Sequence, residues 1–210
     1  MKPRVRAKIC GLTTAEDAFA AVAAGADALG FNFWPGSKRH IVLDEEEAWI
    51  RRLPPLVTRV AVLVNAPLDE AVRVARHPAI DLVQFHGDED ESYCAEFAGH
   101  GYPFLKALRV RDLASLENAA QFSTRHVLLD ADAGSAYGGT GRSLDTALAA
   151  EAVRRFPELH IVLAGGLKPE NVAAAVRAVH PYAVDVASGV ERTPRAKDPE
   201  KMTAFIAALR

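Results

Sequence analysis

A cysteine and an aspartate are the residues of this sequence best suited to move protons. Cys10 follows Lys8 by two residues in a short β-like segment, so the two side chains point to the same face. A neighbouring ammonium group favours the thiolate, which is the basic and reactive form of cysteine. Asp130 ends another β-like segment, and a carboxylic acid in a partly apolar pocket can keep its proton and act as a general acid. We predict a chemical role for both, against the alternatives of an inert buried cysteine and an aspartate that caps a helix or forms a salt bridge.

Two glycine-containing turns predict a phosphate site. Gly165 and Gly166 follow one β-like segment, and Ser188 and Gly189 follow the next. Glycine lets backbone N–H groups approach an anion closely, and a helix N-terminus adds a favourable dipole. Either pair alone is equally well explained as a tight turn. Together, at these two positions, they predict that Gly165, Gly166, Ser188 and Gly189 bind phosphate.

Four further polar residues are candidate substrate contacts. Arg39 lies in the long segment 34–43, and its guanidinium fork suits a carboxylate or a phosphate, although cations in such a loop are often only solvated. Lys8, His86 and Asp185 share the parity of the candidate catalytic residues. A lone histidine is more often structural, and Asp185 lies deeper, where it either supports the residues that contact the substrate or binds a substrate hydroxyl. No pair of histidines has metal-ligand spacing, so we expect no metal.

The elements that must position these side chains alternate along the whole chain. Short β-rich segments and Ala- and Leu-rich helical segments follow one another eight times in 210 residues. The predicted strands are 5–9, 28–33, 58–64, 80–85, 103–107, 126–130, 160–164 and 183–187. The predicted helices are 15–24, 44–52, 67–76, 90–98, 112–119, 145–155, 169–179 and 199–209. This order predicts a single-domain α/β protein, a (β/α)8 TIM barrel over residues 1–210, with an open doubly wound sheet as the alternative.

Side-chain parity within the predicted strands favours closure into a barrel. One parity is apolar and should pack under helices; on the third strand it comprises Val60, Val62 and Val64. The other parity is expected to face the barrel mouth, and it carries Lys8, Cys10, Asn32, Asn65, Gln84, His86, Lys106, Asp130 and Asp185. In an open sheet covered on both faces, so many buried polar groups would be costly. The long connections 34–43 and 131–144 are the candidate substrate arms.

Composition excludes several classes of partner. The formal net charge of -2 gives no reason to expect nucleic acid or an anionic membrane surface. Two cysteines do not make a disulfide framework. No apolar run approaches a membrane span, and the first β-like segment is too short for the core of a signal peptide. We therefore predict a cytoplasmic protein.

The strand ends resemble those of the phosphoribosylanthranilate isomerase family of tryptophan biosynthesis. The similarity covers essentially the whole chain, in order. The motifs that carry it are Lys8-Ile9-Cys10-Gly11-Leu12-Thr13, Gly30-Phe31-Asn32-Phe33, Ser37-Lys38-Arg39, Gln84-Phe85-His86-Gly87, Leu128-Leu129-Asp130, Tyr137-Gly138-Gly139-Thr140-Gly141, Ala164-Gly165-Gly166-Leu167 and Asp185-Val186-Ala187-Ser188-Gly189-Val190-Glu191. Phe85 departs from the family pattern, where a leucine is usual, and Leu144 replaces an aromatic residue.

The resemblance implies an isomerase that performs an Amadori rearrangement on a small phosphorylated substrate. N-(5-phosphoribosyl)anthranilate would become 1-(2-carboxyphenylamino)-1-deoxyribulose 5-phosphate, with Cys10 as general base and Asp130 as general acid. Arg39 would hold the anthranilate carboxylate, and the glycine turns would hold the phosphate. Because only protons move, no cofactor or metal is implied. The expected assembly is a monomer or a homodimer.

Two other functions compete with this one. The related aminoaldose isomerase of histidine biosynthesis also uses a phosphosugar barrel, but it resembles a two-aspartate design with an aspartate where Cys10 stands. A catalytically silent barrel would only bind a phosphosugar. It would be expected to lack an acid–base pair, whereas Cys10 and Asp130 are both present.

Overall fold

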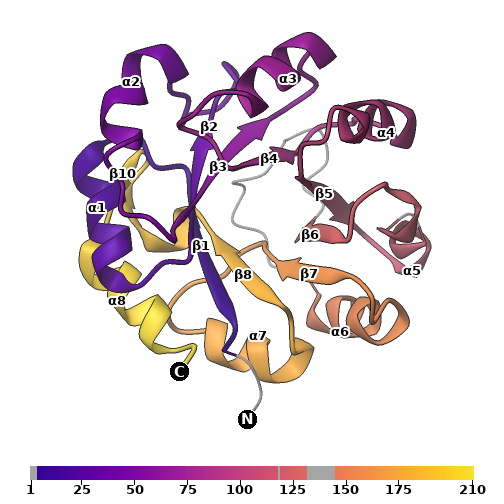
Figure 1. Ribbon diagram of the computed structural model, residues 1–210. Coiled ribbons are helices and arrows are strands. Elements are labelled where there is room, and N and C mark those ends of the chain that lie inside the picture. Colours follow the sequence, from indigo (N-terminus) through magenta and orange to yellow (C-terminus); the bar gives the residue numbers. More distant parts are fainter. Residues whose placement is uncertain (1–3, 118, 132–144) are drawn as a thin grey trace.

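The chain folds into a closed barrel of eight parallel strands surrounded by helices (Figure 1). This computed structural model describes residues 4–117, 119–131 and 145–210. The strands are β1 (Arg6–Cys10), β2 (Ala28–Asn32), β3 (Thr58–Leu63), β4 (Leu82–Phe85), β5 (Phe104–Val110), β6 (His126–Ala131), β7 (His160–Leu163) and β8 (Ala183–Val186). The helices are α1 (Ala15–Ala24), α2 (Leu43–Ile50), α3 (Leu68–Ala75), α4 (Glu91–Gly99), α5 (Leu113–Leu116), α6 (Thr146–Arg155), α7 (Val172–Val179) and α8 (Pro199–Ala207).

The predicted (β/α)8 TIM barrel is therefore confirmed, and the open sheet is excluded. Strand β1 pairs with both β2 and β8, which closes the ring. Of the two candidate arms, 34–43 is described, whereas most of 131–144, with the glycine motif at 137–141 and Leu144, lies outside the described residues.

Helix starts are set by capping side chains placed just before them. The side-chain oxygen of the preceding residue accepts a backbone N–H in the first turn at Thr14, Asp90, Asp145 and Asp198. Such a cap satisfies a donor that the helix itself leaves unpaired. These caps fix where α1, α4, α6 and α8 begin, and thus the length of the segments that lead into them.

The barrel interior is apolar below and polar at the strand ends. Its apolar layer consists of Leu82, Leu105, Ala107, Leu128, Val162, Ala164 and Ala183. Two parity predictions are wrong. Val62 and Val64 line the mouth cavity, while Ala61 and Leu63 pack against the helices. Lys106 lies on the outer face of β5, and its Nζ is 5.7 Å from the centre of the Phe122 ring.

Phe85, which departs from the family pattern, faces outward into an aromatic cluster. Its ring centroid lies 5.3 Å from that of Tyr93, 4.9 Å from that of Phe97 and 5.5 Å from that of Phe104. The first two contacts are edge-to-face, a favoured geometry for aromatic pairs. The larger side chain is thus accommodated beneath α4, away from the mouth.

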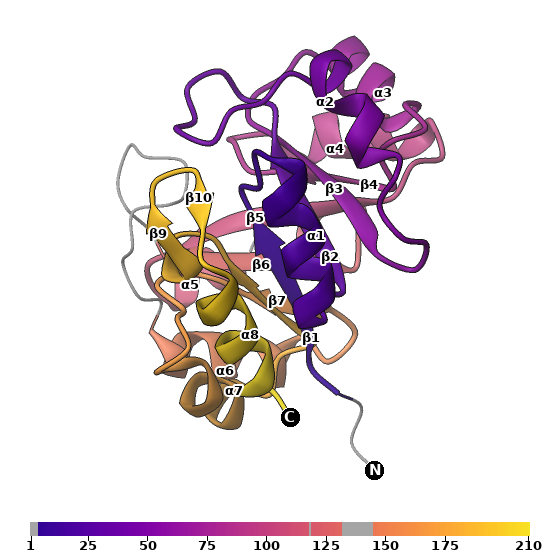
Figure 2. The same ribbon diagram turned by 90° about the vertical axis from the view of Figure 1, so that its left-hand side faces the viewer.

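A short hairpin between β8 and α8 has no counterpart in the sequence predictions. It consists of β9 (Glu191–Thr193) and β10 (Ala196–Lys197), and it follows the 3-10 turn η2 (Ser188–Val190). Figure 2 shows this hairpin and the loop between β2 and α2 at the same end of the barrel, opposite the two chain termini. Arg195 of the hairpin donates to the carbonyl oxygens of Lys38 and His40, at 3.2 and 3.1 Å. The hairpin therefore braces the 34–43 arm.

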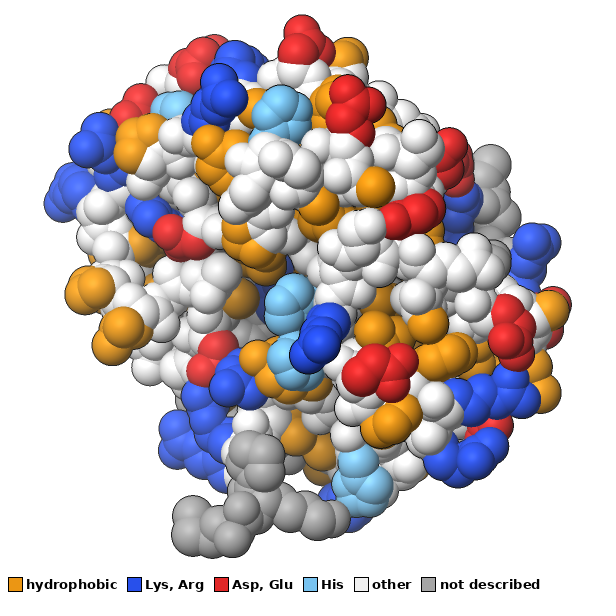
Figure 3. Space-filling view, turned by 45° about the vertical axis from the view of Figure 1, so that its right-hand side comes forward, with side chains coloured by type: hydrophobic (Ala, Val, Ile, Leu, Met, Phe, Trp, Pro, Cys, Tyr) orange, Lys and Arg blue, Asp and Glu red, His pale blue; other side chains and the backbone are white. Residues whose placement is uncertain are grey.

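The face drawn in Figure 3 carries charges of both signs. In Figure 3 acidic and basic side chains are interspersed over the face shown, in keeping with the net charge of -2. Within the described residues, no helix is long and apolar enough to cross a membrane.

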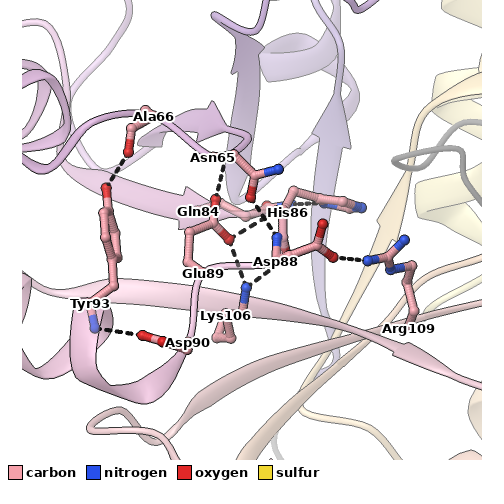
Figure 4. Close-up of polar contacts among 11 residues, drawn as sticks. Asn65, Ala66, Gln84, His86, Asp88, Glu89, Asp90, Tyr93, Lys106 and Arg109 are labelled. Carbon is pink, nitrogen blue, oxygen red and sulfur yellow. Dashed lines mark hydrogen bonds and ion pairs between the residues drawn. The ribbon is translucent and has the colours of Figure 1, made fainter.

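A buried ion pair ties the loops of β3, β4 and β5 together (Figure 4). Lys106 Nζ lies 2.7 Å from Glu89 Oε2, and the two side chains are only 3% and 2% exposed. Glu89 also accepts the backbone N–H of Asn65 at 2.8 Å and of Gly87 at 2.9 Å. One carboxylate thus holds the ends of two neighbouring strands.

The buried pair predicts a large and specific loss of stability in Lys106→Met. The substitution leaves the Glu89 charge buried without its ammonium, which typically costs about 3–5 kcal/mol. Arg51→Met provides the matched control, because Arg51 pairs with Glu47 on an exposed helix face and such pairs contribute only about 0.3–0.5 kcal/mol. Urea unfolding measures both free energies, and equal losses would contradict the prediction.

Candidate active site

The predicted site residues surround one cavity at the C-terminal ends of the strands. The cavity has a volume of about 700 Å³, which lies in the range of small-molecule sites. All of them except Lys8 line it, namely Cys10, Arg39, His86, Asp130, Gly165, Gly166, Asp185, Ser188 and Gly189. Asn32 and Trp34 complete the wall on the side of the 34–43 arm. Residues from six segments of the chain are thus brought together as the sequence predicted.

Lys8 lies behind the cavity wall and is paired with Asp185. Its Nζ is 2.7 Å from Asp185 Oδ1, and the side chains are 6% and 9% exposed. Burial lowers the pKa of Lys8, but the Asp185 carboxylate and the neighbouring Cys10 outweigh it, so the pKa is raised. Lys8 is therefore a permanent cation that holds Asp185 at the floor of the cavity.

The expected activation of Cys10 by Lys8 is not the net effect in this structure. Burial raises the pKa of the Cys10 thiol, and this outweighs the lowering by Lys8; Asp185 adds a further increase. The ammonium that should favour the thiolate is already paired with a carboxylate. Cys10 is thus a thiol at neutral pH, and its thiolate is a correspondingly stronger base.

Arg39 is held in a fixed orientation by a carboxylate that the sequence analysis assigned no role. Arg39 Nε and Nη2 donate to the two carboxylate oxygens of Glu191, at 2.6 and 2.7 Å. The side chain passes over Gly11, where an added Cβ would lie 2.2 Å from Arg39 Cδ. Gly11 also has a φ of +74°, so glycine is required there for two reasons. The edge of the guanidinium not used by Glu191 remains for a ligand.

Glu191 is itself anchored by a fully buried lysine. Lys197 Nζ lies 3.0 Å from Glu191 Oε1 and also donates to the carbonyl oxygen of Ala187 at 3.0 Å. Burial raises the pKa of Glu191, but the hydrogen bonds from Arg39 and Lys197 lower it more, so the carboxyl stays ionised. The chain of contacts from Lys197 through Glu191 fixes Arg39 at the rim of the cavity.

The glycine turns after β7 and β8 pack directly against each other. An added Cβ at Gly189 would lie 1.9 Å from the carbonyl oxygen of Leu167, so only glycine fits at this close approach. Asn171 secures the first turn, because its Nδ2 donates to the carbonyl oxygen of Gly166 at 3.0 Å and its Oδ1 accepts from the N–H of Lys168 at 2.8 Å. The two turns form one wall of the cavity.

Asp130 faces His86 across the mouth. Asp130 Oδ2 lies 3.3 Å from His86 Nε2, and the side chains are 14% and 12% exposed. The opposite ring nitrogen, His86 Nδ1, is 2.7 Å from Gln84 Nε2 (Figure 4). Among the described residues, no group of three or more histidine, cysteine, aspartate or glutamate side chains is arranged to hold a metal ion.

Glu191 and Lys197 are the site-forming residues that sequence reasoning missed. Glu191 belongs to a motif quoted for its glycine turn, but nothing local signals its contact with Arg39, 152 residues away in sequence. Lys197 falls in a segment with no predicted element, and a lysine in such a position is ordinarily solvated. Only the tertiary fold reveals that it is 0% exposed.

Comparisons with known proteins give a consistent result. A family model described as N-(5'phosphoribosyl)anthranilate (PRA) isomerase matches residues 7–208. The N-(5'-phosphoribosyl)anthranilate isomerase of Trichlorobacter lovleyi is 48% identical over 202 residues, which are 96% of each chain. A phosphoribosyl anthranilate isomerase in complex with reduced 1-(o-carboxyphenylamino)-1-deoxyribulose 5-phosphate has a TM-score of 0.83, 36% identity and 98% coverage of both chains. A structure of monomers generated from the dimeric Thermotoga maritima enzyme has a TM-score of 0.85, 36% identity and the same coverage.

The raised pKa of Cys10 predicts how its alkylation depends on pH. Only the thiolate reacts with iodoacetamide, so the rate should rise about tenfold per pH unit and still be rising at pH 9.0, the ordinary value for cysteine. Mass spectrometry of the alkylated peptide gives the rate. Cys10→Ser is the control, because Cys94 is fully buried and its pKa is raised to about 12. A plateau below pH 9 would show that Lys8 controls the thiol instead.

Proposed function

The chain belongs to the N-(5'-phosphoribosyl)anthranilate isomerase family, and we propose that Cys10 and Asp130 are the base and the acid of its reaction. The enzyme is an isomerase of tryptophan biosynthesis that converts N-(5'-phosphoribosyl)anthranilate into its 1-deoxyribulose 5-phosphate isomer.

One observation carries the proposal. Cys10 at the end of β1 and Asp130 in β6 line the same cavity, together with a fixed guanidinium and two glycine turns. An aminoaldose phosphate with an anthranilate group needs an acid and a base between two anion sites. This set of residues supplies each of these groups once.

The first proposed step opens the sugar ring. The Asp130 carboxyl donates its proton to the furanose ring oxygen as the bond from that oxygen to C1 breaks. The lone pair of the anthranilate nitrogen forms the C1=N bond of a protonated Schiff base, so no external electron source is needed. Asp130 leaves the step as a carboxylate.

The second proposed step moves a proton from carbon. The Cys10 thiolate removes the proton from C2, and the electrons of that bond form C1=C2 while the Schiff base becomes an enolamine. The Cys10 thiol then returns a proton to C1 and the Asp130 carboxylate takes up the C2 hydroxyl proton, which gives the aminoketose and restores both groups. The high basicity of the thiolate, which follows from the raised pKa of Cys10, matches the weak acidity of a C–H bond.

The two ends of the substrate are assigned to the two anion sites. Arg39 is proposed to bind the anthranilate carboxylate through the edge of its guanidinium that Glu191 leaves open. Gly165, Gly166, Ser188 and Gly189 are proposed to bind the phosphate through backbone N–H groups. Lys8, Asp185 and His86 are proposed as contacts or supports for the ribose region between them. The proposal uses no metal and no cofactor.

Location and assembly extend the proposal. The substrate is a small phosphorylated molecule, and the expected setting is the cytoplasm, where both free cysteines would stay reduced. The description of a Thermotoga maritima relative as dimeric supports a homodimer as one assembly, alongside the monomer. Nucleic acid and membranes are not expected partners.

Loss of either proposed proton-transfer group should collapse turnover. Cys10→Ser and Asp130→Asn are each expected to lower kcat by about 10²–10⁴-fold, the usual contribution of a general acid or base. The assay follows the loss of fluorescence of freshly generated N-(5'-phosphoribosyl)anthranilate. Cys94→Ser, at a buried position outside the cavity, is the matched control. Near-normal kcat in a folded variant would remove that residue from its role.

Arg39→Lys should weaken substrate binding more than it slows the chemistry. The substitution keeps the positive charge but loses the planar fork that holds a carboxylate in two places. We expect KM to rise by about tenfold while kcat changes less, as for a contact made equally in ground and transition states. The exposed Arg52→Lys is the control. An unchanged KM would show that the substrate carboxylate binds elsewhere.

A further inference from the structure

Two buried polar atoms beside the proposed acid lack hydrogen-bond partners within the described residues. They are Gln84 Oε1 and His86 Nε2. Buried polar side-chain atoms are nearly always paired, so two such atoms on adjoining side chains call for an explanation. Gln84 is only 1% exposed, and neither motif matching nor the proposed mechanism gives it a role.

The geometry joins three residues in a line from the barrel interior to the mouth. The Gln84 amide Nε2 lies 2.7 Å from His86 Nδ1, and His86 Nε2 lies 3.3 Å from Asp130 Oδ2. Figure 4 shows the Gln84 side chain beside His86. Hydrogen bonds of catalytic groups are often long before the substrate binds and shorten in the complex. A small rotation of the ring would make the contact to Asp130 a hydrogen bond.

The amide determines where the imidazole carries its proton. An NH₂ group that donates to Nδ1 requires a lone pair there, so a neutral ring carries its proton on Nε2. That proton is on the ring nitrogen that lies 3.3 Å from Asp130 Oδ2, and it reaches this oxygen once the ring has turned. A protonated carboxyl has one carbonyl oxygen and one hydroxyl oxygen, and donation to Oδ2 makes Oδ2 the carbonyl oxygen. The acidic proton of Asp130 is then on the other oxygen.

We propose that Gln84 is a positioning residue for the reaction, which holds His86 in the tautomer with its proton on Nε2 so that Asp130 presents its proton in one orientation. This inference rests on the proposed role of Asp130 as general acid. An imidazolium at the same place would favour the carboxylate through its charge, and the acid form would be depleted. Donation by the amide opposes protonation of Nδ1 and thereby protects the acid.

The other charged groups around this triad are arranged in pairs. From β1 and β8 the mouth presents Cys10 and the Lys8–Asp185 pair, and from the 34–43 arm it presents Arg39 with Glu191. On the side of β4 and β5, the neighbouring cavity is lined by the Lys106–Glu89 and Arg109–Asp88 pairs and by Arg111. The group that contacts the His86 ring at Nδ1 is the Gln84 amide, which carries no charge.

The test compares two substitutions that a purely structural role would rank in the opposite order. Gln84→Glu keeps the size and the hydrogen bond but stabilises an imidazolium, so kcat at neutral pH should fall by about 100-fold as acid catalysis is lost. Gln84→Met keeps the volume but loses the hydrogen bond, and kcat should fall by only about fivefold. KM should stay within about twofold of the wild-type value in both, because neither change touches the anion sites. The exposed Gln121→Glu adds the same charge as a control.

Nitrogen NMR of the His86 ring gives a second, direct readout in the wild-type enzyme. The expected spectrum has an unprotonated Nδ1 and a protonated Nε2 at neutral pH, and in Gln84→Glu a ring that stays doubly protonated to higher pH. Wild-type kcat in Gln84→Met, a Gln84→Glu enzyme more active than Gln84→Met, or a ring protonated on Nδ1 in the wild type would each overturn the inference.

Asp130→Asn, measured in parallel, separates this inference from the proposed function. If Asp130→Asn retains kcat, the assignment of the acid fails and the inference fails with it. If Asp130→Asn is inactive while both Gln84 variants keep wild-type kcat, the acid stands and only the role of Gln84 is lost.

Discussion

The mouth of this barrel depends on one bidentate ion pair, between Arg39 in the loop after β2 and Glu191 in the hairpin after β8. It joins two segments that are 152 residues apart and turns separate loops into one wall. Lys197 fixes Glu191 from behind, and Gly11 leaves the space through which Arg39 reaches it. Glu191 occupies only one edge of the Arg39 guanidinium. The ion pair therefore orients the guanidinium and leaves its other N–H groups able to donate to an anion. The contact that joins the two loops therefore also orients the guanidinium that is proposed to bind the substrate carboxylate.

Pairing of a cation with a carboxylate also explains the raised pKa of Cys10. A lysine beside a thiol ordinarily lowers its pKa, but here Asp185 binds the lysine and burial dominates, so the pKa is raised. A raised pKa makes the thiolate scarcer and more basic at once. A C–H bond is a weak acid, so removing its proton requires a strong base, and a smaller thiolate fraction is the accompanying cost. The pairing of Lys8 with Asp185 thus limits how far the ammonium lowers the pKa of the Cys10 thiol.

The sequence predicted the elements because each strand end carries its own local signal, whereas the partners of the site residues carry none. Cys10, Asp130 and the glycine turns stand directly after or within β-like segments, and parallel strands bring such ends together. The third strand could not be oriented, because apolar residues occupy both of its faces and only packing places Val62 inside and Leu63 outside. Lys106 was misplaced because its buried partner, Glu89, lies 17 residues away on another loop. Ion pairs of this kind depend on the tertiary structure and produce no periodic pattern in the sequence.

The two sides of the mouth are built from different kinds of polar group, and the difference matches the chemistry proposed for each. The base must lose its proton, and the group beside Cys10 is a cation, Lys8, which favours the charged form. The acid must keep its proton, and the group beside Asp130 is an imidazole tied to a neutral amide. A cation in place of that amide-linked ring would favour the wrong form of the acid, and a neutral group in place of Lys8 would leave burial unopposed at the base. The residues proposed as acid and base can therefore share one cavity, because an imidazole linked to a neutral amide lies beside the first and a paired ammonium lies beside the second.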